Sequence, residues 1–174
     1  LSRVLVVDDH PLFCDALSMT LKSVPGVLKV SAVSTLVAAL DCFDVGKHPD
    51  VVLLDLNLPD VTGLDGLVRL RTKAGNVPIL VVSSMADNRM ISSVLRAGAQ
   101  GFVPKHSQRD TLIEAFQTIA NGARYLPAGF QDVPGSSDIS AEDPSMIVKR
   151  LSSLTNQQAR ILQLICAGKL NKQI

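Results

Sequence analysis

Residues 51–59 read Val51-Val52-Leu53-Leu54-Asp55-Leu56-Asn57-Leu58-Pro59. Four consecutive apolar residues bounded by polar ones are typical of a short strand that is buried on both faces of a sheet. The run then reaches an aspartate, and Pro59 ends regular structure soon after it. A carboxylate at the carboxyl end of a buried parallel strand stands where open α/β sheets bind their ligands. We therefore expect Asp55 to belong to a ligand site.

A second strand ends in the same way. Residues 3–7 form an apolar run that leads directly into Asp8 and Asp9. If this strand and the strand over residues 51–54 are neighbours, three carboxylates converge at one edge of the sheet. Like charges at close range repel one another, and a hard cation such as Mg²⁺ is the natural group to neutralise them. The sequence therefore predicts a magnesium site formed by Asp8, Asp9 and Asp55.

The rest of the first 121 residues alternates strands with helices. Alternation with short connections predicts an α/β fold, with a parallel sheet and right-handed crossovers that place helices on both faces. The expected strands are 3–7, 27–33, 51–54, 79–82 and 101–104, and the expected helices are 11–24, 34–44, 63–74, 87–97 and 107–121.

Local signals place the ends and the inner faces of these helices. Ser34 and Asp87 each stand where a helix cap is expected, because a short polar side chain can accept a hydrogen bond from the first turn. In the third helix, four residues fall at helical spacing, which predicts one shared face: Leu64, Leu67, Val68 and Arg71.

Composition limits the possible classes of protein. The chain has 174 residues, 47% hydrophobic content, no tryptophan and a net charge of +1. No apolar run approaches the ~18 residues that a membrane span needs, and the start does not resemble a signal peptide. The three cysteines have neither metal-ligand spacing nor an even disulfide pattern. We therefore expect a cytoplasmic protein without a membrane segment.

The chain changes character after residue 121. Residues 122–143 are rich in Pro, Gly and Ser, which indicates a linker. After Asp143 there is no acidic residue, while five basic residues follow: Lys149, Arg150, Arg160, Lys169 and Lys172. A basic terminal piece on a near-neutral first domain favours a polyanionic partner.

Four of the five expected strands end in polar residues that belong to one sheet edge. They are the Asp8-Asp9 pair, Asp55, Ser83 and Lys105. Acids that hold a metal, a fixed cation and a hydroxyl together suit a phosphoryl group, where catalysis is mainly positioning and charge neutralisation. No histidine or cysteine lies at an equivalent strand end, so the nucleophile would be a carboxylate. For His10, which follows the acid pair, we expect a packing or surface role.

In this order and spacing, these residues resemble the receiver domain of bacterial two-component response regulators. The resemblance covers residues 1–121 and implies a flavodoxin-like, doubly wound (βα)5 fold with strand order 2-1-3-4-5. It implies that Asp55 accepts the phosphoryl group, that Asp8 or Asp9, Asp55 and the carbonyl of Asn57 bind Mg²⁺, that Ser83 and Lys105 contact the phosphoryl group, and that Phe102 moves with Ser83. One difference stands out: the family usually has a proline after the lysine, whereas here His106 follows Lys105 and Pro104 precedes it.

A second resemblance covers the end of the chain. Residues 154–162, with Gly168 and residues 171–174, are similar to the start of a LuxR-type helix-turn-helix domain, as in NarL-like regulators. Residues 155–158 also match a capping box, with Thr155 at the cap. We expect residues 122–148 to form a linker and residues 149–174 to form an incomplete all-α segment. The base-reading helix would come after Ile174, so only the complete protein is expected to bind DNA.

Together, these patterns indicate a response regulator that receives a phosphoryl group from a sensor histidine kinase, dimerises on activation and controls transcription. It would be a phospho-acceptor and not an enzyme with turnover. Two alternatives stay open. One is a Mg²⁺-dependent phosphatase with an aspartyl nucleophile, although only Asn57 lies where its acid/base carboxylate would be needed. The other is a receiver whose output segment binds a protein.

Overall fold

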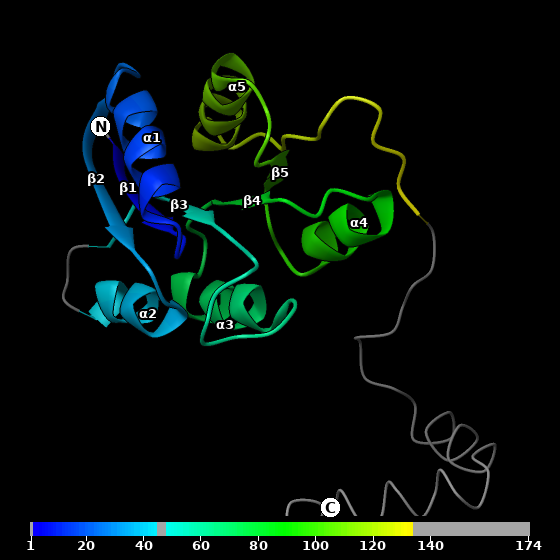
Figure 1. Cartoon of the computed structure of the whole chain (residues 1–174), viewed down its shortest axis with the longest axis horizontal. Coiled ribbons are helices and arrows are strands. Elements are labelled where there is room, and N and C mark those ends of the chain that lie inside the picture. The colour runs from blue at the N-terminus through cyan, green and yellow to red at the C-terminus, as the bar shows by residue number, and fades with distance from the viewer. Residues whose placement is uncertain (1, 45–47, 134–174) are drawn as a thin grey trace, which may run out of the picture. The chain divides into compact units, whose positions relative to one another are not determined.

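The computed structural model describes residues 2–44 and 48–133, and within these ranges five strands alternate with five helices (Figure 1). The alternation is the one that the sequence predicts. The strands are β1 (Ser2–Val7), β2 (Val27–Val33), β3 (Val51–Leu54), β4 (Ile79–Ser83) and β5 (Gly101–Pro104). The helices are α1 (Pro11–Lys22), α2 (Leu36–Asp44), α3 (Asp65–Ala74), α4 (Asn88–Arg96) and α5 (Arg109–Ala120).

All neighbouring strands pair in parallel, in the order β2-β1-β3-β4-β5. The flavodoxin-like order that the sequence implies is therefore confirmed. Val7 pairs with Leu54 at the carboxyl ends of β1 and β3, and Ser83 pairs with Pro104 at the ends of β4 and β5. Because parallel strands end at the same edge, the residues that follow these positions meet there.

The helices form two layers around the sheet. α1 and α5 cover one face, while α2, α3 and α4 cover the other (Figure 1). Successive residues of a strand point to opposite faces, so Val52 and Leu54 of β3 join one core cluster, and Val51 and Leu53 join the other. Burial on both sides explains why β3 is uniformly apolar.

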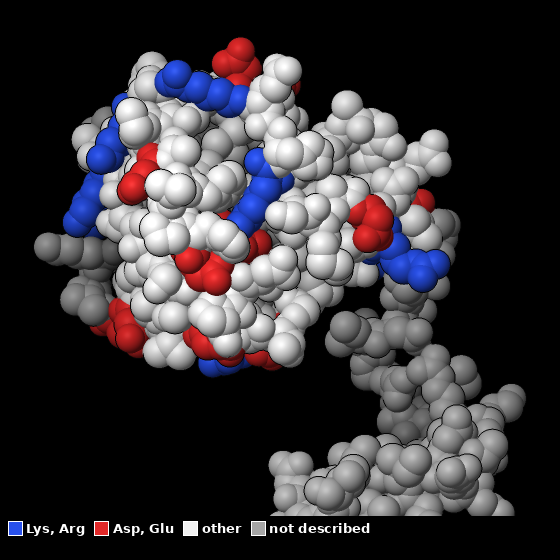
Figure 2. All heavy atoms as spheres, viewed as in Figure 1, with Lys and Arg blue, Asp and Glu red and all other residues white. Residues whose placement is uncertain are grey.

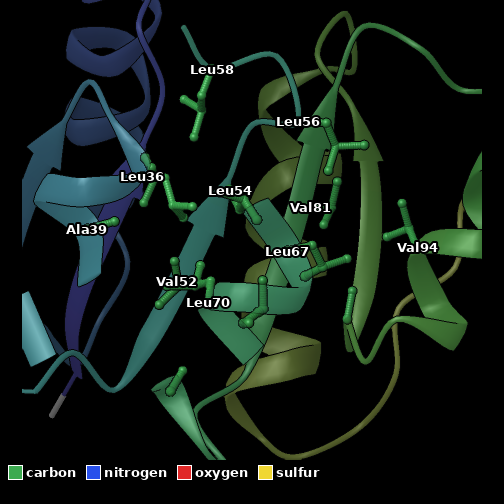
Figure 3. Close-up of a cluster of buried hydrophobic side chains, with 14 of the residues drawn as sticks. Leu36, Ala39, Val52, Leu54, Leu56, Leu58, Leu67, Leu70, Val81 and Val94 are labelled. Carbon is green, nitrogen blue, oxygen red and sulfur yellow. The ribbon is translucent and has the colours of Figure 1, made fainter. Parts of the chain in front are cut away.

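The cluster under α2, α3 and α4 is shown in Figure 3, where Leu70 of α3 lies beside Val52 of the sheet and Leu67 lies near Val81. Both leucines are fully buried. Val68, which the helical spacing placed on the same face as Leu67, is instead 47% exposed. That expectation was wrong, because the buried residues of α3 are 66, 67, 70 and 74, and Val68 falls outside this stripe.

Helix caps account for two of the predicted boundaries. Asp87 caps α4 as expected, since its side chain accepts a hydrogen bond from the backbone N–H of Met90 at 2.9 Å. The cap of α2 is Thr35 and not Ser34, because Thr35 Oγ1 accepts the N–H of Ala38 at 3.2 Å. Thr35 directly precedes the first helical residue, so its hydroxyl can reach the first turn, whereas Ser34 lies one residue too early.

The chain does not leave the sheet at the end of α5. Tyr125 forms an isolated parallel bridge with Gly101, so residues just after α5 run beside the edge strand β5. These residues, up to 133, are the described part of the expected linker 122–148; the expected helix-turn-helix segment 149–174 lies outside the described residues. No helix in the described ranges is long and apolar enough to cross a membrane.

Candidate functional site

Two buried carboxylates form the centre of the site. Asp8 follows β1 and Asp55 follows β3, and each is only 3% exposed. Backbone hydrogen bonds extend the sheet to both residues: the N–H of Asp8 donates to the carbonyl of Val33, and the N–H of Asp55 donates to that of Val7. The adjacency of β1 and β3 therefore brings the two acids together, as the sequence predicts.

Lys105 joins these two acids. Its Nζ lies 2.7 Å from Asp8 Oδ2 and 2.8 Å from Asp55 Oδ2. The backbone N–H of Lys105 donates to the carbonyl of Ser83, which continues the pairing of β5 with β4. Nζ also lies 4.8 Å from the centre of the Phe13 ring, within range of a cation–π contact. One ammonium group is thus held between two carboxylates at the edge of the sheet.

The protonation state of Lys105 follows from these contacts. Burial by itself would lower its pKa, because it penalises the charged form. The hydrogen bonds and negative charges of Asp55 and Asp8 outweigh that effect, and the net result is a pKa above the usual value for lysine. Lys105 is therefore a fixed cation at neutral pH.

The acids outnumber this cation. Asp8, Asp9, His10 and Asp55 each offer a ligand atom, and these four atoms all lie within 4.8 Å of one another. Asp55 Oδ1 is buried and has no hydrogen-bond partner among the residues that the structure describes. Three carboxylates against one ammonium leave excess negative charge, and an unpaired carboxylate oxygen is a ready ligand or nucleophile. This donor set fits a hard divalent cation.

His10 belongs to this cluster, although the sequence favoured a packing or surface role for it. Its Nδ1 lies 2.8 Å from Asp9 Oδ1 and 3.0 Å from Asp8 Oδ1. Its backbone N–H also donates to Asp8 Oδ1, at 2.9 Å. The sequence feature that could have placed His10 in the cluster is its position directly after the Asp8-Asp9 pair.

Ser83 and Phe102 lie beside this cluster on the neighbouring strands. Both are fully buried. The Ser83 hydroxyl accepts the backbone N–H of Met85 at 3.3 Å, so it bonds the start of the β4–α4 loop. Phe102 pairs with Val81, two residues before Ser83, and its ring joins the core cluster under α2, α3 and α4. The hydroxyl and the aromatic ring therefore lie on adjacent strands, as expected.

The loop after Asp55 is anchored by a residue that the sequence did not single out. Asn57 is exposed in this loop. Three residues later, Asp60 accepts hydrogen bonds from the backbone N–H groups of Leu36 and Val37, each at 3.0 Å. These are N–H groups of the first turn of α2, which have no partner within the helix. Asp60 therefore ties the loop that carries Asn57 to a second helix.

Cys14 contacts the site from the other side, through a hydrogen bond from its thiol to the backbone carbonyl of Asp8 at 3.2 Å. Burial raises the pKa of this thiol, and the negative charge of Asp8 raises it further. A thiol held in its neutral form is a poor nucleophile. Cys14 therefore acts as a small packing residue beside the site, and its thiol is a poor candidate for a nucleophile.

Figure 2 shows acidic and basic side chains meeting near the middle of the face that is turned to the viewer, while most of the surrounding surface is uncharged. A cluster of acids with a fixed lysine, at the carboxyl edge of a sheet with order β2-β1-β3-β4-β5, can be compared with known proteins.

The response regulator receiver domain family matches residues 4–117. The chain is 35% identical to the glycerol metabolism activator of Pseudomonas putida over 178 residues, a match that covers 99% of this chain and 79% of that protein. It is 28% identical to the nitrate/nitrite response regulator protein NarL of Escherichia coli, over 99% of this chain and 79% of NarL. A LuxR family DNA-binding response regulator from Silicibacter pomeroyi has 31% identity and a TM-score of 0.66, over 75% of this chain and all of that one. The chain belongs to the response regulator receiver family, and its relatives are regulators of the NarL and LuxR kind.

Proposed function

We propose that Asp55 is the phospho-acceptor of this response regulator. One observation carries the assignment: Asp55 Oδ2 is bound by Lys105, while Oδ1 of the same buried carboxylate has no partner among the described residues. Oδ1 would attack the phosphorus of a phosphohistidine in a sensor kinase, and the bond from phosphorus to the histidine nitrogen would break. The product is an acyl phosphate on Asp55.

Charge explains the remaining roles. A phosphoryl group adds about −1.5 to −2 charge at pH 7 to a site that is already acidic. Asp8, Asp9, Asp55 and the carbonyl of Asn57 would hold Mg²⁺, which when bound neutralises the carboxylates and the incoming group. Lys105, already within 2.8 Å of Asp55 Oδ2, would shift its contact to a phosphoryl oxygen.

The output assignment rests on the relatives and on the sequence beyond residue 133. We infer that residues 1–121 are the receiver, 122–148 a linker and 149–174 the first part of a LuxR-type DNA-binding domain. Five basic residues and no acid after Asp143 suit a segment that contacts DNA phosphates. Phosphorylation would favour a homodimer, and a protein with the full helix-turn-helix would read a two-fold related site, one half-site per subunit.

Incubation with Mg²⁺ and acetyl phosphate tests the acceptor assignment. The protein should gain one acid-labile phosphoryl group, and chelation of Mg²⁺ should prevent the gain. A phosphatase would instead turn over a small ester such as p-nitrophenyl phosphate many times per protein molecule. Sustained turnover of that ester, lost in the Asp55→Asn protein, would overturn the proposal in favour of a true enzyme.

A further inference from the structure

The segment after α5 runs back across the molecule and reaches α4. We call residues 123–133 the strap. It is yellow in Figure 1, where it passes β5 and continues to α4. Tyr125 and Phe130 of the strap are partly buried and pack against the two core clusters, one on each side of the sheet. The strap is therefore attached to both layers of the fold.

The first attachment is to β5. The backbone N–H of Phe102 donates to the carbonyl of Tyr125, and the N–H of Tyr125 donates to the carbonyl of Gln100. Gly101 allows this approach: a Cβ at that position would lie 3.0 Å from the Tyr125 carbonyl oxygen and 3.1 Å from Tyr125 Cβ. The strap thus bonds directly to the backbone of Phe102, the aromatic residue that is expected to respond to the phosphorylation site.

The second attachment is to α4. Ser92 is 1% exposed, and its hydroxyl donates to Asp132 Oδ1 at 2.9 Å and accepts the N–H of Val133 at 3.1 Å. Arg96, one turn further along α4, contacts Asp132 Oδ1 at 3.3 Å and also the carbonyl of Val133. Hydroxyl, carboxylate and guanidinium groups can exchange these partners for water, so this attachment can open at little cost compared with a packed apolar contact.

Both attachments lie on elements that lead away from the site. α4 begins five residues after Ser83, and β5 carries Phe102 beside it. If Ser83 moves toward a phosphoryl group, its bond to Met85 is lost and the start of the β4–α4 loop is freed. A shift of α4 relative to β5 would change the distance between the two attachments of the strap, and the strap could not keep both.

We propose that the strap is a latch that closes over α4 in the unphosphorylated protein and leaves α4 when Asp55 is phosphorylated. This inference rests on the proposed function of Asp55. Release exposes the α4–β5 face. By linkage, a state favoured by the phosphoryl group is also favoured by weakening the latch.

Hydrogen exchange of the whole 174-residue chain tests the latch, with beryllium fluoride and Mg²⁺ as the phosphoryl mimic. Exchange in peptides that cover residues 126–133 should rise on the order of 5-fold or more on addition of the mimic, while β3 peptides stay protected. The Asp132→Ala protein should show the faster exchange without the mimic and should bind the mimic about 5-fold more tightly. Asp44→Ala removes an ion pair with Lys73 on the other side of the domain and should change neither quantity.

The outcomes separate the two proposals. Binding of the mimic through Asp55 with unchanged exchange at 126–133 would overturn the latch alone. So would an Asp132→Ala protein with wild-type affinity for the mimic. If the wild type did not bind the mimic, or if Asp55→Asn bound it as tightly as the wild type, the acceptor role and the latch would both be overturned.

Discussion

Lys105 Nζ binds one oxygen of the Asp55 carboxylate, Oδ2, at 2.8 Å and leaves the other, Oδ1, buried without a partner among the described residues. The same ammonium binds Asp8 at 2.7 Å. Lys105 therefore holds both acids and fixes the orientation of the carboxylate that we propose as the acceptor. Stability and reactivity are linked at this residue, which makes it the first target for mutation.

Lys105→Met should remove the charge and leave two nearly fully buried carboxylates without their counter-ion. We expect the free energy of unfolding at pH 7 to fall by about 3 kcal/mol, the range for breaking a buried ion pair from one side. Mg²⁺ should raise the melting temperature of the variant more than that of the wild type, since the cation replaces the lost charge. Thermal unfolding with and without MgCl₂ measures both effects.

Lys29→Met is the matched control for this experiment, because Lys29 is an exposed lysine on β2. It should change the free energy of unfolding by less than about 0.5 kcal/mol and leave the response to Mg²⁺ as it is in the wild type. If Lys105→Met were as mild as this control, the two contacts of Lys105 would have no energetic importance and its assigned role would be wrong.

Ser83→Ala should separate phosphorylation from its consequence. Within residues 2–44 and 48–133, the hydroxyl bonds only the β4–α4 loop, so Asp55 should still accept a phosphoryl group without it. The variant would lose the hydrogen bond from residue 83 to the phosphoryl group, which only the phosphorylated state can form. The increase in self-association on adding beryllium fluoride should therefore be smaller by on the order of tenfold. Sedimentation measures this gain, and Ser84→Ala, at the exposed neighbour, should behave as the wild type. Wild-type association by Ser83→Ala would remove Ser83 from the switch.

Asp60 gives a prediction for acid pH. Burial would raise its pKa, but the N–H groups of Leu36 and Val37 stabilise the carboxylate and lower the pKa below its usual value. The stabilisation of α2 by Asp60 is therefore fully present above the unfolded pKa of about 3.9 and is lost as pH falls through the lower, folded pKa. Asp60→Asn loses one of the two acceptor oxygens and the charge beside the helix N-terminus, so it should cost about 0.5–1 kcal/mol at pH 7. The cost should shrink as the pH falls below about 3.9.

Urea unfolding of wild type and Asp60→Asn at a series of pH values measures this difference. Asp41→Asn, an exposed acid on α2 itself, is the control and should show no such pH dependence. A difference between wild type and Asp60→Asn that stayed constant from pH 7 to pH 3 would show that the charge of Asp60 does not stabilise α2.

Arg71 tests the stability of the opposite edge of the sheet. Its guanidinium donates to the carbonyls of Val77 and Gly98 and to Gln100 Oε1, and so joins the loops that precede β4 and β5. Arg71→Lys cannot make this fork of bonds and should lower the free energy of unfolding by about 2 kcal/mol while Asp55 is phosphorylated as before. Urea unfolding compares it with Arg69→Lys, whose surface pair with Asp65 should matter little. Equal effects of the two variants would contradict this reading.

The alternating elements and the layered fold could be predicted because their signals are local. The uniformly apolar β3, the Pro–Gly ends and the helical spacing each act over a few residues. Which apolar residue of α3 faces inward could not be predicted so well, since 67, 68 and 70 are all apolar and only tertiary packing selects Leu70 over Val68. The strap was missed for a similar reason: it begins a stretch, residues 122–143, whose Pro, Gly and Ser content indicates a linker, and its partners Ser92 and Arg96 are distant in sequence.

At the site, the acids, Ser83 and Lys105 could be predicted to meet because strand ends of a parallel sheet share one edge. Contacts made by side chains from loops could not. His10 approaches Asp8 and Asp9 through a turn whose geometry no spacing rule gives, and Asp60 reaches α2 across the sheet edge. The sequence therefore indicates which groups form the site more fully than it indicates the neighbouring residues that hold them in place.

Trapping the phosphoryl group on the protein tests the central claim most directly. The chain is incubated with Mg²⁺ and acetyl phosphate, the acyl phosphate is reduced with borohydride, and peptides are mapped by mass spectrometry. We predict that borohydride converts residue 55 alone. Asp55→Asn should lose the modification, and Asp9→Asn, which keeps the acceptor, should be modified to a smaller extent than the wild type. Modification at another residue of the wild type, or full labelling of Asp55→Asn, would contradict the assignment of Asp55 as the phospho-acceptor.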